Sequence, residues 1–282
     1  ILIFPFALYI NYRSYYFLVT QNFVYINIIR TLQTVVPFVL FVLLDFISVI
    51  RIENQFITLF FSYIILYCIV SFKFNHFNHG ITTHVSISNL WDILKLSCKY
   101  SFPLILLGLN FKVDSFILAS YDIDMLGVYS VGVNFAELVW QLPMVISLVF
   151  FSYGLKQKGS TVAYSEFVVK KTILIMLLLI PTLLVYGLCV YFALPFIYGV
   201  DFSKASNVVL LMLPGVYFVT GFNLLNAEAS SRGLPHLTLI PLVFGLIINV
   251  VLNLYLVPIL GLYGAALSSS ISYSCIFFIY VY

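Results

Sequence analysis

The sequence predicts an all-α membrane protein that crosses the bilayer several times. Of its 282 residues, 63% are hydrophobic and only 8% are charged, whereas soluble domains carry about 25% charged residues. The mean hydropathy is +1.11. Apolar stretches of about 20 residues, the length of a membrane-spanning helix, recur along the chain. So few charged residues exclude a water-soluble surface, and the small net charge of +3 gives no indication of a nucleic-acid partner.

Nine apolar stretches separated by polar breaks predict nine transmembrane helices. The first stretch is short and is predicted to be the end of a helix. Pro103, Pro143, Pro181 and Pro214 lie inside four of the others and predict kinks. The predicted limits are Ile1–Tyr9, Phe23–Leu44, Gln55–Phe72, Ser97–Ser120, Met125–Phe151, Val168–Tyr191, Ala205–Ala227, Leu237–Val257 and Leu262–Tyr282.

One connection is long and polar, and it divides the chain. Residues 74–96 are predicted to form a linker between residues 1–73, with three spans, and residues 97–282, with six. Within this linker we expect a surface helix beginning near Asn89, with Trp91 at the membrane interface.

The charge of the loops predicts the orientation of the helices. Alternate loops lie on opposite sides of the membrane, and one set carries most of the basic residues, so the positive-inside rule makes that set cytoplasmic. The other set carries only Arg51 and Lys204. If the natural N-terminus is cytoplasmic, an odd number of spans precedes Ile1. The basic residues of the cytoplasmic set are Arg13, Lys73, Lys95, Lys99, Lys156, Lys158, Lys170, Lys171 and Arg232.

A polar stripe marks the stretch Met125–Phe151. It consists of Gly127, Ser130, Asn134, Glu137 and Gln141, whose spacing of 3, 4, 3 and 4 puts all five on one helix face. Two interpretations are open: the wall of a hydrophilic cavity, or hydrogen bonding to neighbouring helices. The carboxylate favours the cavity, because a charge near the bilayer centre costs roughly 2.5–3.5 kcal/mol.

Two cations inside predicted spans are candidates for binding an anionic substrate. Arg30 suits a phosphate, because its planar guanidinium offers two parallel hydrogen bonds, and the alternative is a structural salt bridge. Lys112 is the second candidate, and the alternative is that its long side chain reaches out to the membrane surface. Asp114 is two residues away and cannot face Lys112 on a regular helix.

The sequence carries no motif of a catalytic or cofactor site. The four cysteines, Cys68, Cys98, Cys189 and Cys275, are too far apart for a metal-binding pattern. Signatures of nucleotide-binding loops, hydrolases and metalloproteases do not occur. We therefore expect a protein that is not an enzyme and that needs no cofactor. If the protein needs an energy source, we expect an ion gradient rather than ATP bound to this chain.

Four segments, in order, resemble the polysaccharide-export flippases of the MOP superfamily, the O-antigen translocase (Wzx) type. An early proline, Pro103, precedes Asp114 and the apolar residues that follow it, and the segment Gly127-Val-Tyr-Ser130 opens the next helix. The segment LPFIYGVDFSKAS and the Asn-rich segment NVVLNLYLVPILGLYGAALSSSIS complete the resemblance, which covers nearly the whole chain.

This resemblance implies two six-helix lobes, with residues 1–73 as the last three helices of the first lobe and three helices preceding Ile1. It also implies that residues 74–96 form the cytoplasmic interlobe linker and that residues 97–282 form the second lobe. Such proteins move an undecaprenyl-diphosphate-linked oligosaccharide from the inner to the outer leaflet of the bacterial plasma membrane by alternating access, which makes this lipid and the membrane lipids the expected partners.

The expected substrate contacts follow from the stripe and the two cations rather than from a family motif. Arg30 and Lys112 would meet the diphosphate, Asn134 and Gln141 the sugars, and Glu137 the sugars or a coupling H⁺, with Na⁺ as the other candidate ion. A cation-coupled multidrug antiporter of the same superfamily is an alternative. A membrane polysaccharide polymerase is less favoured, because the predicted outer loops are short and acidic.

Overall fold

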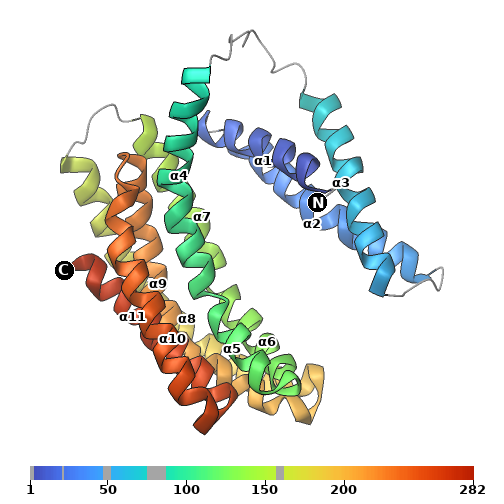
Figure 1. Cartoon of the computed structure of the whole chain (residues 1–282), viewed down its shortest axis with the longest axis vertical. Helices are drawn as coiled ribbons and strands as arrows, with labels where there is room; N and C mark the ends of the chain where they lie inside the picture. The colour runs from blue at the N-terminus through green and yellow to red at the C-terminus, as the bar shows by residue number, and fades with distance from the viewer. Residues whose placement is uncertain (1–2, 21, 47–51, 75–86, 157–161) are drawn as a thin grey trace. The chain divides into compact units, whose positions relative to one another are not determined.

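The structure is a computed structural model that describes residues 3–20, 22–46, 52–74, 87–156 and 162–282. Every regular element among these residues is a helix (Figure 1). The chain divides into two compact units, Ile1–Val85 and Ser86–Tyr282, each described here by itself. Most of the predicted linker, residues 75–86, lies outside the described residues, and its last part, residues 87–96, is helical.

The first unit contains α1 (Phe4–Val19), α2 (Phe23–Phe46) and α3 (Ile52–Phe74), and α1 packs against both of the others. Arg13 was predicted in a loop, and this prediction is wrong. The helix continues to Val19, and the buried Arg13 guanidinium donates hydrogen bonds to the Tyr9 hydroxyl oxygen at 3.2 Å. The predicted helix ended too early because the charged Arg13 lowers the local hydropathy of the sequence.

The second unit contains eight α-helices. They are α4 (Ile87–Asn110), α5 (Val113–Tyr121), α6 (Ile123–Leu138), α7 (Gln141–Lys156), α8 (Val162–Tyr198), α9 (Ser203–Ser231), α10 (Leu239–Leu260) and α11 (Leu262–Val281), with short 3₁₀ turns at Val200–Phe202 and Pro235–Thr238. The surface helix expected near Asn89 is not separate, because α4 runs without interruption from Ile87 past Pro103.

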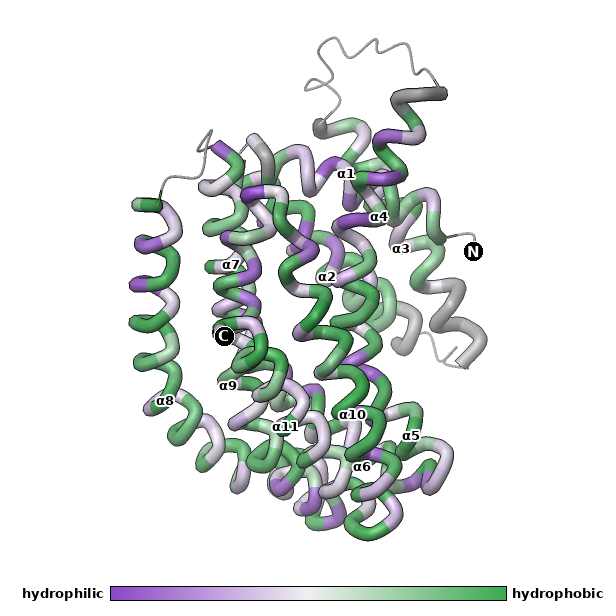
Figure 2. The backbone as a smooth tube through the Cα atoms, turned by 60° about the vertical axis from the view of Figure 1, so that its left-hand side comes forward, coloured by the Kyte–Doolittle hydropathy of each residue, from purple (hydrophilic) through white to green (hydrophobic). Residues whose placement is uncertain are grey.

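The protein is a multi-pass membrane protein by the length and composition of its helices. In the described residues, six helical segments are long and apolar enough to cross a membrane, and the bent pair α6–α7 makes a seventh. Figure 2 shows long hydrophobic stretches along α8 and α10. Many of their large apolar side chains are exposed, as expected for helices surrounded by lipid.

Helix α9 is the centre of the second unit, and α6, α7, α8 and α11 all pack against it. Small residues allow these close contacts. A Cβ atom added to Gly215 of α9 would lie 2.5 Å from the Cα atom of Ser270 in α11, and one added to Gly132 of α6 would lie 2.8 Å from the Cβ atom of Val208. Gly264, Ser268 and Ser272 are spaced four residues apart in α11, and all three are buried, as expected for small residues at a close helix contact.

Several basic segments assigned to the cytoplasmic side meet at one end of the second unit. The Lys99 ammonium donates a hydrogen bond to the Gly233 carbonyl oxygen at 2.8 Å. The Arg232 guanidinium donates one to the Ser165 hydroxyl oxygen at 3.3 Å. The middle of α4, the start of α8 and the end of α9 therefore lie together.

Candidate functional site

Two interrupted helices meet inside the second unit. The first interruption, Phe111–Lys112, separates α4 from α5, and the second, Val139–Trp140, separates α6 from α7. The rings of Phe111 and Trp140 lie with centroids 4.8 Å apart, and Tyr273 of α11 lies 5.4 Å from Phe111. Phe111 is about 16 Å along the helix from the turn at Asp122, near the middle of a hydrocarbon core about 30 Å thick.

The bend between α6 and α7 follows from Pro143. This proline is in the first turn of α7, and it cannot donate a hydrogen bond to the carbonyl oxygen of Val139, four residues earlier. The two helices bend by 47° at this point. The kink predicted at Pro143, inside the predicted span Met125–Phe151, is confirmed, and α6 and α7 lie on either side of it.

Side chains of neighbouring helices sustain the interruption between α4 and α5. The Asn249 amide nitrogen donates to the Asn110 carbonyl oxygen at 2.9 Å and to the Asn110 side-chain oxygen at 2.8 Å. The Ser272 hydroxyl donates to the same side-chain oxygen at 3.1 Å. Because the helix ends at Asn110, its carbonyl oxygen needs such a donor, and α10 supplies it in place of the chain's own backbone.

Asp114 is a buried structural carboxylate. It is completely buried at the start of α5, and it accepts hydrogen bonds from the hydroxyl groups of Tyr129 at 2.5 Å and Ser269 at 2.8 Å and from the backbone N–H of Ser115 at 2.7 Å. These bonds tie α5 to α6 and α11. The carboxylate therefore serves the packing of three helices, as the separate faces of Asp114 and Lys112 suggested.

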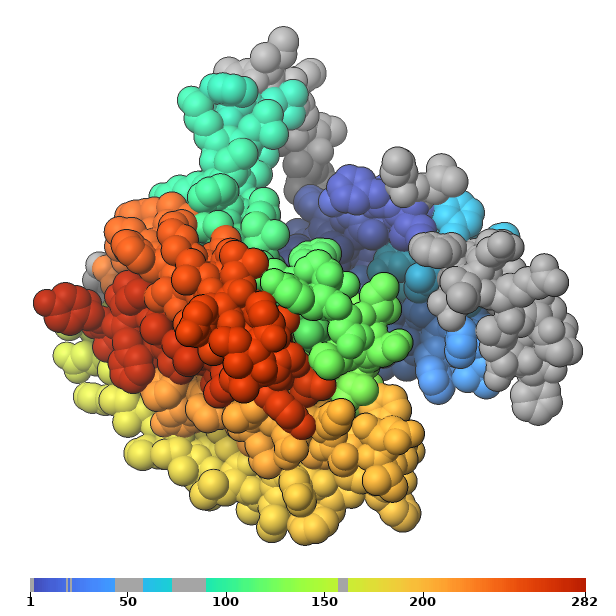
Figure 3. Space-filling model, turned by 60° about the horizontal axis from the view of Figure 1, so that its bottom comes forward, coloured from blue at the N-terminus to red at the C-terminus, as the bar shows by residue number. Residues whose placement is uncertain are grey.

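The predicted polar stripe faces away from the core of its own unit. Gly127, Asn134 and Gln141 are exposed, and Ser130 and Glu137 are half-buried. The opposite face of α6, formed by Tyr129, Gly132, Val133 and Ala136, is buried. Figure 3 shows the α5–α6 segment (green) at the surface beside α10 and α11 (orange to red).

The stripe differs from the prediction at one end. Gln141 is the first residue of α7, so it lies beyond the 47° bend and does not continue the straight face of α6. Among the described residues, no hydrogen bond joins Asn134, Glu137 or Gln141 to a neighbouring helix. Helix–helix hydrogen bonding within the second unit is therefore not the reason for these polar side chains.

Lys112 lies beside this face. It is exposed in the interruption between α4 and α5, and its charge and that of Asp114 both act electrostatically on Glu137. The described residues hold two ion pairs, Lys170–Glu166 and Arg232–Glu228, and neither includes Lys112 or Glu137. The Lys112 charge thus acts on Glu137 without an ion pair between the two side chains.

Arg30 belongs to the first unit. It lies on α2, where its side chain is exposed, and no ion pair in the described part of the chain includes it. The structural salt bridge considered as the alternative for Arg30 does not occur there.

The sequence did not predict the aromatic cluster of Phe111, Trp140 and Tyr273. The three residues are far apart in the chain and belong to no spacing pattern. The i, i+4 spacing of Asn249 and Asn253 indicates a polar contact between helices, but nothing in the sequence indicates that Asn110 is the partner.

Comparisons with protein-family models, with curated proteins and with solved structures find nothing that matches this chain.

Proposed function

We propose that this chain is part of a flippase for lipid-linked oligosaccharides, of the MOP polysaccharide-export type, in the bacterial inner membrane. The proposal includes a two-lobed bundle of which nine spans are present in this chain, with the first unit contributing three and the second six. The cargo is an undecaprenyl-diphosphate-linked polysaccharide repeat unit, which moves from the inner to the outer leaflet by alternating access.

The observation that carries the proposal is the polar face of α6. A carboxylate and an amide on a membrane helix, turned away from the core of their own unit, are costly against lipid. They are favourable where the helix borders water or a hydrophilic substrate. The exposed Lys112 beside this face supports the same conclusion, because a charge near the bilayer centre is also costly against lipid.

The proposed roles follow the chemistry of each side chain. Lys112 and Arg30 are positively charged, and neither belongs to an ion pair among the described residues. Each is proposed to contact the diphosphate. Asn134 and Gln141 hydrogen-bond to sugar hydroxyl groups. Glu137 binds sugar or exchanges the coupling ion, H⁺ or Na⁺, under the influence of the Lys112 charge.

Complementation tests the proposal. The full-length protein is expressed in a bacterial strain that lacks its flippase, and surface polysaccharide is measured together with the amount of protein in the membrane. We expect restoration by the wild type, and at least tenfold less polysaccharide for Lys112→Ala and Glu137→Ala at equal protein amounts. Leu184→Ala, on an exposed part of α8, is the control.

Two outcomes would contradict the proposal. Full restoration by Arg30→Ala, Lys112→Ala and Glu137→Ala would show that these side chains do not bind the substrate. A wild type that restores no polysaccharide but exports cationic dyes would be a cation-coupled antiporter instead.

A further inference from the structure

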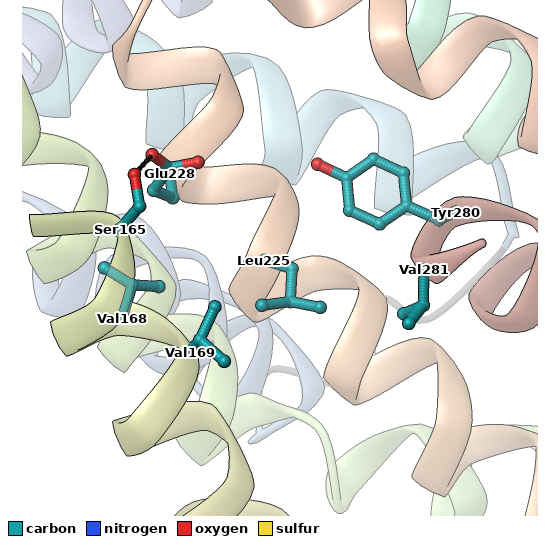
Figure 4. Close-up of a pocket in the computed structure, with 7 residues that line it drawn as sticks. All are labelled: Ser165, Val168, Val169, Leu225, Glu228, Tyr280 and Val281. Atoms are coloured by element: carbon teal, nitrogen blue, oxygen red, sulfur yellow. Dashed lines mark hydrogen bonds between the residues drawn. The ribbon is translucent and has the colours of Figure 1, made fainter. Parts of the chain in front are cut away.

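A pocket of about 270 Å³ opens at the end of the second unit where α8 begins and α9 and α11 end (Figure 4). Its walls are mostly apolar and include Val169, Leu225 and Val281. This is the end at which Lys99 and Arg232 make their contacts, and the loop charges predict that it is cytoplasmic. The pocket therefore lies where the headgroups of the inner leaflet meet the helices.

Glu228 brings an uncommon charge into this apolar pocket. Its side chain is only 14% exposed. One of its carboxylate oxygens, Oε1, accepts a hydrogen bond from the Ser165 hydroxyl at 2.6 Å and from the Arg232 guanidinium at 3.0 Å. Figure 4 shows the second oxygen directed across the pocket toward Tyr280. In the described part of the chain, no donor reaches that second oxygen.

Tyr280 forms the facing side of the pocket. Its hydroxyl group points toward Glu228 in Figure 4, and the carboxylate acts on it electrostatically. The ring is held by an edge-to-face contact with Phe222, at 5.1 Å between centroids. The Tyr280 hydroxyl and the Glu228 carboxylate thus face each other across the pocket, and no hydrogen bond joins them in the described part of the chain.

We infer that this pocket binds the headgroup of an amine-bearing phospholipid of the phosphatidylethanolamine class. A primary ammonium donates hydrogen bonds to the free oxygen of Glu228 and to the hydroxyl oxygen of Tyr280. The guanidinium of Arg232, which is 34% exposed, has further N–H groups for the lipid phosphate. The apolar wall receives the first part of an acyl chain.

Charge and size both favour this occupant. An anionic headgroup such as phosphatidylglycerol would bring its negative charge to Glu228, and a choline headgroup has no N–H to donate. The volume is below the roughly 300–1,000 Å³ of typical small-molecule sites, so the pocket holds a headgroup and not a whole lipid. The inference does not depend on the transported substrate.

Lipid titration of the purified full-length protein in detergent, followed by native mass spectrometry, tests the inference. The lipids are phosphatidylethanolamine, its singly and doubly N-methylated forms, phosphatidylcholine and phosphatidylglycerol. We expect the first to bind at least about tenfold more tightly than phosphatidylcholine and phosphatidylglycerol, with affinity falling as methyl groups replace N–H donors.

Variants locate the site. Glu228→Gln removes the charge but also the ion pair with Arg232, so two variants that keep this pair decide the outcome. Tyr280→Phe removes one hydroxyl group, and Val169→Trp fills the pocket. Both are expected to abolish the preference, whereas Leu177→Trp, two turns further along α8 and 59% exposed, is expected to leave it unchanged.

Two results would overturn the inference. Equal affinity of the wild type for the ethanolamine, choline and glycerol lipids would show that the pocket does not select an amine. A preference that survives both Tyr280→Phe and Val169→Trp would place the lipid elsewhere on the protein. Neither result bears on the complementation experiment, so the flippase proposal stands or falls separately.

Discussion

The ring of Phe111 lies against the indole of Trp140, with centroids 4.8 Å apart and planes inclined by 31°. Each residue belongs to an interruption between two helices, so the contact joins the two points at which the membrane helices of the second unit lose their regular backbone. Tyr273 of α11 lies 6.5 Å from Trp140 and completes the cluster. The polar face of α6 ends beside this cluster, at Glu137.

The first prediction concerns the coupling between the two rings. Phe111→Leu, Trp140→Leu and the double variant are compared by thermal unfolding of the purified protein. The contact between the rings predicts a coupling free energy of about 0.5–1.5 kcal/mol, so the double variant loses less stability than the sum of the single variants. Phe111→Leu combined with Phe167→Leu, on a distant part of α8, is expected to be additive. Additivity of the Phe111 and Trp140 variants would contradict the contact.

The second prediction concerns Asp114. Asp114→Ala leaves the hydroxyl groups of Tyr129 and Ser269 without their acceptor in a buried site, at a cost of about 1–3 kcal/mol for each unpaired group. We expect a clear fall in the unfolding temperature and in the amount of protein in the membrane. Asp124→Ala, at an exposed position of α6, serves as the control. Equal stability of the two variants would show that Asp114 does not hold the three helices together.

The third prediction concerns the approach of α9 to α11. In Gly215→Ala the new methyl group would lie 2.5 Å from the Cα atom of Ser270 and 2.8 Å from its carbonyl oxygen, so one helix must move. Overpacking of this kind costs about 1–3 kcal/mol. Gly108→Ala is the matched control, because its new methyl group would meet nothing within 4 Å and alanine favours a helix. A Gly215→Ala protein as stable as Gly108→Ala would contradict the helix packing described here.

The sequence predicts the helical membrane class and the approximate position of each helix, because apolar stretches between polar breaks determine both. The bend between α6 and α7 is also predictable, since Pro143 lies in the first turn after it. The interruption after Asn110 is not, because Phe111 and Lys112 are neither proline nor glycine and Gly108, two residues before Asn110, still lies within α4. It depends on Asn249 and Ser272, which approach Asn110 only in the folded bundle.

The candidate site, too, could be predicted only in part from the sequence. The spacing of Ser130, Asn134 and Glu137 predicts that they share a face of α6, and the structure confirms this. It also shows that the shared face is turned away from the core of the second unit. The spacing could not reveal the direction of that face, because the buried side of α6 is set by its contact with α9. The proximity of Lys112 to Glu137 likewise depends on the packing of the two interrupted helices.

The central claim is that the polar face of α6 borders water and substrate rather than lipid, and cysteine accessibility tests it most directly. Cys68, Cys98, Cys189 and Cys275 are first replaced by alanine. A single cysteine is then introduced by Asn134→Cys, and in a control protein by Leu184→Cys, where the native side chain is 72% exposed on α8.

A membrane-impermeant methanethiosulfonate is applied from each side of the membrane. A thiol in water ionises and reacts, whereas a thiol in hydrocarbon does not. We predict at least about tenfold faster labelling at position 134 than at position 184, with slowing by the lipid-linked oligosaccharide. Equally slow labelling at both positions would show that the face of α6 is covered by lipid and would contradict the account.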